Sequence, residues 1–253
     1  MQMIERKIQG LVSGIRAFFK ETRAKGIVIG LSGGIDSSVA LALISRAVGS
    51  SKILALSLPE KGQEKNSKDA KGLCKSLKVK FRKISIDEIA KIILGKTGIS
   101  NGLPKANLKA RIRMSMLYLY ANSLNYIVAG TGNKSELMLG YFTKYGDGGI
   151  DFLPIGSIFK TEVYEIAEAL YIPKKIIQKI PSANLYHGQT DEKELGFKYG
   201  ELDKVLEFLE KKGTTKKSLK QAEKLFGRGI ANAVTKRIKA NLHKRNLPKV
   251  ISP

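Results

Sequence analysis

Residues 26–38 read GIVIGLSGGIDSS, and this stretch decides the fold. The apolar run 26–31 predicts a buried strand, and the apolar run 39–48 predicts a helix. The Ser- and Gly-rich turn between them brings backbone N–H groups to the start of that helix. The partial positive charge of a helix N-terminus favours an anion there. The segment therefore predicts a strand–turn–helix unit that cradles a phosphate.

The spacing within this turn excludes two common phosphate-binding motifs. No Lys-Ser/Thr pair closes it as a Walker A loop, and Gly30, Gly33 and Gly34 lack the dinucleotide spacing G-x-G-x-x-G. The turn does resemble SGGxDS, the pyrophosphate loop of the ATP pyrophosphatases, which activate a substrate by adenylation. Asp36 predicts Mg²⁺, because a carboxylate beside a phosphate needs a cation between them. The simpler alternative is an ordinary βα turn in which the helix dipole favours Asp36.

The composition of the 253-residue chain is that of a folded protein with a sizeable core, since 43% of its residues are hydrophobic. The single cysteine, Cys74, excludes a disulfide framework and fits a reducing compartment. No apolar run approaches the roughly 20 residues that span a bilayer, and the N-terminus lacks a signal-peptide pattern. We therefore expect a cytoplasmic protein with no membrane contact.

The charge of the chain is strongly basic, with a formal net charge of +23. Such a charge raises nucleic-acid binding as an alternative. The densest basic cluster, 61–83, contains Ala70, Leu73, Cys74 and Leu77 at helical spacing, so its lysines fit the solvated face of an amphipathic helix. Aromatic residues for base stacking are few there. We therefore disfavour nucleic acid and note that a basic surface also attracts ATP and dinucleotides.

The order of elements predicts an α/β fold, with a Rossmann-like parallel sheet and helices on both faces. The expected strands are 26–31, 52–58, 79–86 and 125–130. The expected helices are 1–24, 36–48, 64–77, 87–94 and 107–124, with a loop at 98–104. Ligands of such folds bind at the carboxyl ends of the strands, where two Gly-rich turns are expected.

The part of the chain beyond residue 140 predicts loops and helices. Residues 141–157 are rich in turn formers, 181–195 are irregular, and the expected helices are 160–171, 197–211 and 218–242. No repeat or linker divides the sequence. We expect a single domain over residues 1–253 with a C-terminal helical extension.

Five segments, in order from about residue 26 to about residue 246, carry a family resemblance. They read SGGIDSS (32–38), KARIRM (109–114), GTGNKSE (130–136), GYFTKYGDGGID (140–151) and PSANLYHGQTDEKELG (181–196). Together they closely resemble NAD synthetase in its short, ammonia-dependent form. Several adenylating ligases share SGGxDS, whereas GYFTKYGDGG is much more restrictive.

The resemblance implies the amidation of nicotinic acid adenine dinucleotide, or deamido-NAD. ATP adenylates the nicotinate carboxylate and releases pyrophosphate, and ammonia then displaces AMP to give NAD. No covalent protein nucleophile is required, in agreement with the lack of a Ser-His-Asp or Cys-His arrangement in the sequence. The implied ligands are ATP, deamido-NAD, ammonia and Mg²⁺, and the implied assembly is a homodimer with the dinucleotide site at the subunit interface.

The same resemblance implies roles for individual residues. The implied ATP-binding residues are Gly30, Leu31, Ser32, Gly33, Gly34, Ile35, Asp36, Ser37, Thr131, Lys160 and Ser182. The implied deamido-NAD-binding residues are Arg111, Lys144, Asp151, His243 and Lys244. The implied Mg²⁺ ligands are Asp36 and Glu136. Weaker candidates for ATP contacts are Leu56, Leu58 and Gln63.

Other interpretations accompany several of these residues. Taken alone, Lys160 and Glu136 would be surface residues, and His243 a helix-end histidine. His187 is expected to position rather than react, and Arg113 is expected to point away from Arg111. Only about 25 residues precede the first strand, too few for a glutaminase domain. We therefore expect free ammonia as the nitrogen source.

Two alternative functions are weighed against NAD synthesis. One is another SGGxDS adenylating ligase, either GMP synthetase-like or tRNA-modifying. The tRNA version would predict a sulfur-handling cysteine pair or an RNA-binding appendage, and a single cysteine argues against the former. The other is a non-catalytic nucleotide- or nucleic-acid-binding protein. That class would predict loss of Asp36 or Glu136, and both are present.

Overall fold

The computed structural model describes residues 2–99, 102–182 and 188–251. Its sheet has four strands in the order β3-β2-β1-β4, and all neighbouring pairs are parallel. The strands are β1 (Gly26–Gly30), β2 (Ile53–Ser57), β3 (Lys80–Lys83) and β4 (Tyr126–Ala129). The predicted α/β fold with a Rossmann-like parallel sheet is confirmed.

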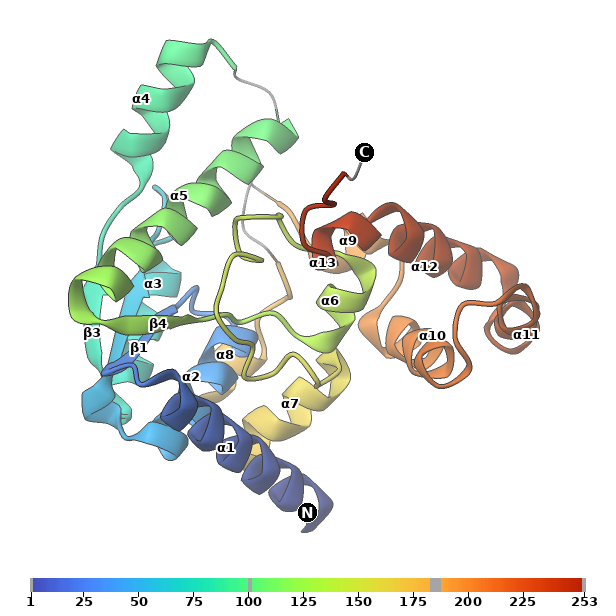
Figure 1. Cartoon of the computed structure of the whole chain (residues 1–253), viewed down its shortest axis with the longest axis horizontal. Helices are drawn as coiled ribbons and strands as arrows, with labels where there is room; N and C mark the ends of the chain where they lie inside the picture. Colours follow the sequence, from blue (N-terminus) through green and yellow to red (C-terminus); the bar gives the residue numbers. More distant parts are fainter. Residues whose placement is uncertain (1, 100–101, 183–187, 252–253) are drawn as a thin grey trace.

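Helices cover both faces of this sheet (Figure 1). Side chains alternate between the faces of a strand, so Ile27 and Ile29 of β1 enter one buried cluster and Val28 enters another. The first cluster is completed by α1 (Gln2–Thr22), α2 (Ile35–Val48), α3 (Glu64–Ser76) and α7 (Lys160–Ala169). The second is completed by α4 (Asp87–Thr97) and α5 (Gly102–Leu124).

The C-terminal extension builds a third apolar cluster beside the sheet, at the right of Figure 1. Its main helices are α10 (Tyr199–Lys212), α11 (Lys216–Phe226) and α12 (Arg228–Ala240). Shorter helices are α6 (Lys134–Leu139), α8 (Lys174–Ile177), α9 (Asp191–Leu195) and α13 (Leu242–Arg245). The single-domain organisation stays a prediction.

The expectation of one helix over 218–242 is wrong. Two helices meet at Gly227, whose φ of 96° lies in the region that favours glycine. The expected loop at 98–104 is also too long, since α5 begins at Gly102. Pro104 lies in the first turn of α5, where its missing N–H would have no partner within the helix in any case.

The third strand differs from the expected apolar strand at 79–86. β3 is short, and its Lys80, Arg82 and Lys83 are exposed. It lies at the edge of the sheet, where charged side chains hinder pairing with another chain. The formation of β3 therefore depends on its pairing with β2 at the sheet edge and not on a continuous apolar run.

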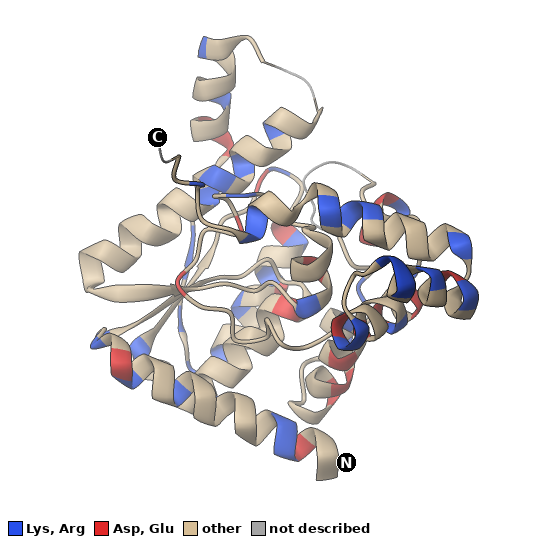
Figure 2. Ribbon diagram, turned by 45° about the vertical axis from the view of Figure 1, so that its right-hand side comes forward, with Lys and Arg blue, Asp and Glu red and all other residues tan. Residues whose placement is uncertain are grey.

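The basic residues are spread over many helices in Figure 2, in agreement with the interpretation of their lysines as solvated faces. Cys74 is buried, as predicted, and burial raises the pKa of its thiol to about 12. Within the described residues, every helix is too short or too polar to cross a membrane.

Candidate functional site

A cavity of about 1090 Å³ opens at the carboxyl ends of β1, β2 and β4. Its walls are the turns after β1 and β4, the segment after β2, one side of α5, the loop 140–147 and residues near α13. The volume lies slightly above the range of about 300–1,000 Å³ that is typical of small-molecule sites, as expected for a site that holds more than one small molecule. Ligands of open parallel sheets bind at this edge.

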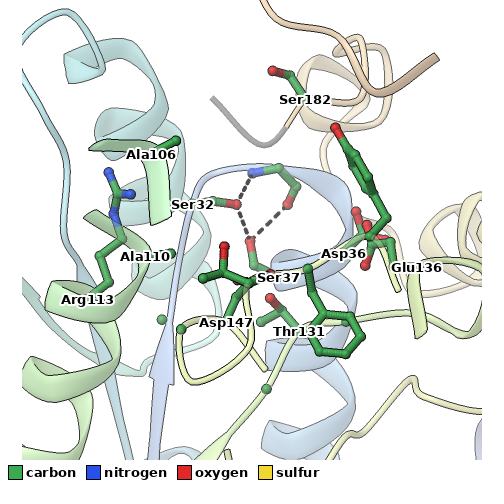
Figure 3. Close-up of a pocket in the computed structure, with 18 of the residues that line it drawn as sticks. Ser32, Asp36, Ser37, Ala106, Ala110, Arg113, Thr131, Glu136, Asp147 and Ser182 are labelled. Atoms are coloured by element: carbon green, nitrogen blue, oxygen red, sulfur yellow. Dashed lines mark hydrogen bonds between the residues drawn. The ribbon is translucent and has the colours of Figure 1, made fainter. Parts of the chain in front are cut away.

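The turn after β1 forms the floor of the cavity, and its serines hold it in shape (Figure 3). The Oγ of Ser32 accepts a hydrogen bond from the backbone N–H of Gly34 at 3.2 Å and lies 3.1 Å from the Oγ of Ser37. Gly34 is the N-cap of α2 and offers no side-chain acceptor. The N–H groups of the first turn of α2 therefore lack a side-chain cap and are suited to binding an anion.

Gly33 lies where no side chain fits. Its φ is 77°, and a Cβ there would lie 2.3 Å from the backbone oxygen of Asn66. We expect Gly33→Ala to lower the free energy of unfolding by more than about 2 kcal/mol, because steric overlap adds to backbone strain. The measurement is urea unfolding.

Gly196→Ala is the matched control for this prediction. Gly196 has a φ of 83° in the left-handed conformation, and a Cβ there would meet nothing within 4 Å. We expect it to lose only the strain of the left-handed conformation, about 1–2 kcal/mol. Equal losses in the two variants would contradict the close packing at Gly33.

The carboxylates of Asp36 and Glu136 lie beside each other above the turn (Figure 3). Fully buried Asn133 joins them. Its Nδ2 donates to Oδ1 of Asp36 at 3.0 Å, and its backbone N–H donates to Oε2 of Glu136 at 3.0 Å. Its side-chain oxygen accepts from the backbone N–H of Glu136, which closes a capping box at the start of α6. The cap of α6 thereby places Glu136 next to Asp36.

Lys160, the first residue of α7, partly neutralises this pair of acids. It is 1% exposed, and its Nζ forms an ion pair with Oδ2 of Asp36. Burial disfavours its charged form, but the carboxylates of Asp36 and Glu136 outweigh that cost and raise the pKa of Lys160. The site thus combines a buried ammonium group with two carboxylates.

The raised pKa of Glu136 predicts how the free energy of unfolding changes with pH. Burial, together with the charge of Asp36, raises the pKa of Glu136 from 4.5 to about 8. The folded state therefore binds this proton more tightly than the unfolded state. Its contribution to stability is complete below about pH 4.5 and is lost as the pH rises to about 8. We expect Glu136→Gln to flatten the fall of the free energy of unfolding over this pH range.

Urea unfolding of the ligand-free protein across this pH range checks the prediction. Glutamine keeps the acceptor that the capping box of α6 requires. The control is Glu201→Gln, which changes the same kind of cap at the exposed start of α10 and should leave the wild-type slope intact. A slope in Glu136→Gln equal to that of the wild type would contradict the raised pKa of Glu136.

Four predicted substrate-binding residues gather on another wall. Nζ of Lys144 donates to the backbone oxygen of His243 at 2.8 Å, and Arg111 donates to that of Lys144 at 3.4 Å. Nζ of Lys244 donates to the backbone oxygen of Gly140 at 2.7 Å. The end of the chain is thus bound to the loop 140–147, and three cations face the cavity. This wall suits a polyanion.

Comparison with known proteins agrees with this geometry. The NAD synthase family model matches residues 7–248. An NH(3)-dependent NAD(+) synthetase of Archaeoglobus fulgidus is 44% identical over 248 residues, which are 97% of this chain and 96% of that protein.

The chain belongs to the NAD synthase family.

Two solved structures are similar along their whole length. The NMN synthetase from Francisella tularensis has a TM-score of 0.83 and 36% sequence identity, and the match covers 99% of this chain and 98% of that one. The NH3-dependent NAD synthetase from Campylobacter jejuni, in complex with the nitrate ion, has a TM-score of 0.83 and 30% identity, with 98% and 99% covered.

In this NAD synthase family member, the cavity collects most of the residues predicted to bind ligands. The predicted ATP-binding residues that line it are Gly30, Leu31, Ser32, Gly34, Ile35, Asp36, Ser37, Thr131, Lys160 and Ser182. The weaker candidates Leu56, Leu58 and Gln63 also line it, as does Glu136. Gly33 lies outside the lining, against Asn66. His187 is outside the described residues.

Asp151 is the predicted substrate residue that the cavity does not include. Its Oδ1 accepts a hydrogen bond from the hydroxyl of Tyr118 at 2.9 Å, and its Oδ2 accepts from the backbone N–H of Val128 at 2.7 Å. This carboxylate therefore connects the loop after residue 147 to β4. Its contact with deamido-NAD stays a prediction.

Three residues without an assigned role also line the site. Asp147 lines the cavity, and its Oδ1 accepts a hydrogen bond from the backbone N–H of Thr143 at 2.9 Å. Glu194 approaches from α9. Arg113 also lines the cavity, with partners other than those of Arg111: its Nε donates to the backbone oxygen of Leu58 at 2.9 Å, and its guanidinium pairs with Glu60 at 3.0 Å. Asp147 and Arg113 fall within the motifs quoted from the sequence, but only the tertiary structure shows that they line the cavity.

Proposed function

We propose that this chain is an ammonia-dependent NAD synthetase that uses ATP to amidate deamido-NAD. The observation that carries the proposal is the cluster of Asp36, Glu136 and buried Lys160 beside an uncapped helix N-terminus, in a chain of the NAD synthase family. We take ammonia as the nitrogen source and NAD as the product from the names of relatives such as the Archaeoglobus protein, and deamido-NAD is the acid whose amide is NAD.

The floor of the cavity would hold ATP. The N–H groups at the start of α2, the hydroxyls of Ser32 and Ser37 and the ammonium of Lys160 are suited to the phosphates. Leu56 and Leu58, at the end of β2, are suited to flank adenine. Thr131 and Ser182 offer hydroxyls from two further walls.

Asp36 and Glu136 are the residues proposed to hold Mg²⁺. Carboxylate oxygens are the donors that this cation prefers, and their closeness to each other fits a shared cation. No group of three or more His, Cys, Asp or Glu able to hold a metal occurs in the described ranges, so ATP would supply further oxygens. When bound, Mg²⁺ neutralises charge on the departing pyrophosphate.

The basic wall would hold deamido-NAD so that its nicotinate carboxylate meets ATP. Arg111, Lys144 and Lys244 are suited to the dinucleotide phosphates, with His243 beside them. The carboxylate oxygen attacks the α-phosphorus of ATP, which gives an acyl adenylate and pyrophosphate. Ammonia then attacks the acyl carbon, and AMP leaves. The protein's part is to orient both nucleotides and to exclude water from the adenylate.

We also propose a cytoplasmic homodimer. Large apolar side chains on α4 and α5 are exposed, among them Ile92, Leu103 and Leu119. Arg111, proposed to bind deamido-NAD, lies on the same α5, so a second subunit packed on this helix would lie next to the substrate site. Sedimentation equilibrium should give twice the chain mass of 27.8 kDa at micromolar protein. A species of 27.8 kDa under those conditions would contradict the dimer.

The test of function is an assay with ATP, Mg²⁺, ammonium and deamido-NAD. We expect NAD, AMP and pyrophosphate in equal amounts, and no NAD when glutamine replaces ammonium. Products ADP and phosphate would contradict adenylation. Nicotinic acid mononucleotide is the second substrate to test, because one similar structure is an NMN synthetase. A preference for the mononucleotide would overturn the assignment of deamido-NAD.

A further inference from the structure

One face of α10 packs next to Lys160, at the start of α7. Tyr199 and Asp203 are four positions apart on this helix, so their side chains project from the same face. Tyr199 is 4% exposed and Asp203 is 5% exposed. Neither residue lines the cavity, so neither is placed to touch a ligand there.

Asp203 fixes the backbone at the start of α7, where Lys160 lies. Its Oδ2 accepts a hydrogen bond from the backbone N–H of Thr161 at 2.9 Å. Its Oδ1 accepts from the hydroxyl of Ser135, whose Oγ in turn accepts from the backbone N–H of Lys160 at 2.9 Å. Ser135 directly precedes Glu136 in the sequence. One buried carboxylate thus connects the start of α7 with the residue next to Glu136.

Tyr199 meets the other end of the same lysine. The Nζ of Lys160 lies 5.5 Å from the centroid of the Tyr199 ring, within the range of a cation–π interaction. The hydroxyl of Tyr199 donates to Oδ2 of Asp191 at 3.3 Å, which anchors the outer end of this side chain. Lys160 is therefore held at its backbone by Asp203 and at its ammonium group by Tyr199.

We propose that Tyr199 and Asp203 are positioning residues that set the places of Lys160 and Glu136. The C-terminal helical extension is then part of the ATP site, although none of its contacts with Lys160 involves a ligand. This role rests on the proposed function, in which Lys160 binds the phosphates of ATP. It predicts weaker binding of Mg-ATP, with deamido-NAD binding unchanged, when the face of α10 is altered.

Asn is the informative replacement for Asp203 because it preserves size and one acceptor. Its oxygen can still accept from the backbone N–H of Thr161. Its amide nitrogen cannot accept from the hydroxyl of Ser135 and would instead donate to that oxygen, which already accepts from Lys160. The hydrogen-bond chain from α10 to Lys160 is then broken at one point while the core remains filled.

The experiment is calorimetric titration of the full-length chain with Mg-ATP and, separately, with deamido-NAD. We expect Asp203→Asn to raise the Kd for Mg-ATP about tenfold, the scale of a lost hydrogen bond to a charged group, and to leave deamido-NAD binding unchanged. We expect Tyr199→Leu to raise it about fivefold and Tyr199→Phe, which keeps the ring, to restore it.

Val205→Ala is the control on the same helix. Val205 is fully buried and takes no part in the hydrogen bonds of Asp203, so its truncation destabilises α10 and leaves those hydrogen bonds in place. We expect this variant to lose stability and keep wild-type affinity for Mg-ATP. If Asp203→Asn fails to fold, Ser135→Ala breaks the same chain of hydrogen bonds and should raise the same Kd.

Each outcome decides for or against the role. Unchanged Mg-ATP affinity in Asp203→Asn, beside a wild type that binds, overturns the inference and leaves the proposed function standing. An equal loss of affinity in Val205→Ala shows a general structural effect and also overturns it. A wild-type protein that does not bind Mg-ATP overturns the proposed function and the inference with it.

Discussion

Lys160→Met is expected to lower kcat/KM for ATP by about a thousandfold, because it removes a preorganised buried cation from the phosphate site. Lys160 is almost fully enclosed and is ion-paired with Asp36, so solvent cannot replace its charge. Steady-state kinetics with ATP varied at saturating deamido-NAD and ammonium measure the loss.

Lys134→Met is the matched control for this change. Lys134 begins α6 and pairs with the exposed side chain of Glu210 at 2.6 Å, and it does not line the cavity. We expect its kcat/KM to stay within about twofold of the wild type, because exposed ion pairs contribute little. Equal losses in both variants would mean that general charge, rather than the buried ammonium of Lys160, supports catalysis.

The stability of Lys160→Met should depend on pH. Without Lys160, the carboxylates of Asp36 and Glu136 repel each other with no cation between them. Protonation of Glu136 relieves this repulsion. Because the pKa of Glu136 is raised to about 8, the carboxyl group is protonated at about pH 5 and partly ionised at about pH 8. We therefore expect a larger loss of unfolding free energy at about pH 8 than at about pH 5. Losses of the same size at both pH values would contradict the electrostatic account.

Asp36→Asn is expected to lower kcat for amidation by about a thousandfold while the protein stays folded. Asparagine keeps the oxygen that accepts from Nδ2 of Asn133, so the local packing survives. The same change removes the negative charge that raises the pKa of Glu136. Glu136 then ionises more readily and can pair with Lys160, which keeps the ammonium compensated. Kinetics with Mg²⁺ varied and thermal melting measure the two effects.

Asp87→Asn is the control for Asp36→Asn. Asp87 also lies in the first turn of a helix that covers the sheet, but it is exposed and outside the cavity. We expect its activity to equal that of the wild type. Wild-type activity in Asp36→Asn would remove Asp36 from the metal site. A collapse of its melting temperature would show that Asp36 serves folding rather than ATP.

The strands and helices of the first half were predictable because the signals are local. The apolar run before the Ser/Gly turn predicted β1, and the run after it predicted α2, each within one or two residues of the observed bounds. Turn chemistry and helical periodicity act over a few residues and can be read directly from the sequence. β3 was less visible, since a charged edge strand carries no apolar pattern.

The sequence by itself determined the phosphate turn, the parallel sheet and the family, because these depend on motifs and short periodicities. Only the tertiary structure decided which side chains meet. Asn133 lies 97 positions from its partner Asp36, and Lys160 lies 124 positions from the same carboxylate. Asp151 bonds to β4, Arg113 lines the cavity, and Tyr199 and Asp203 lie next to Lys160. Such contacts depend on how helices and sheet pack, and no local pattern of polarity encodes that arrangement.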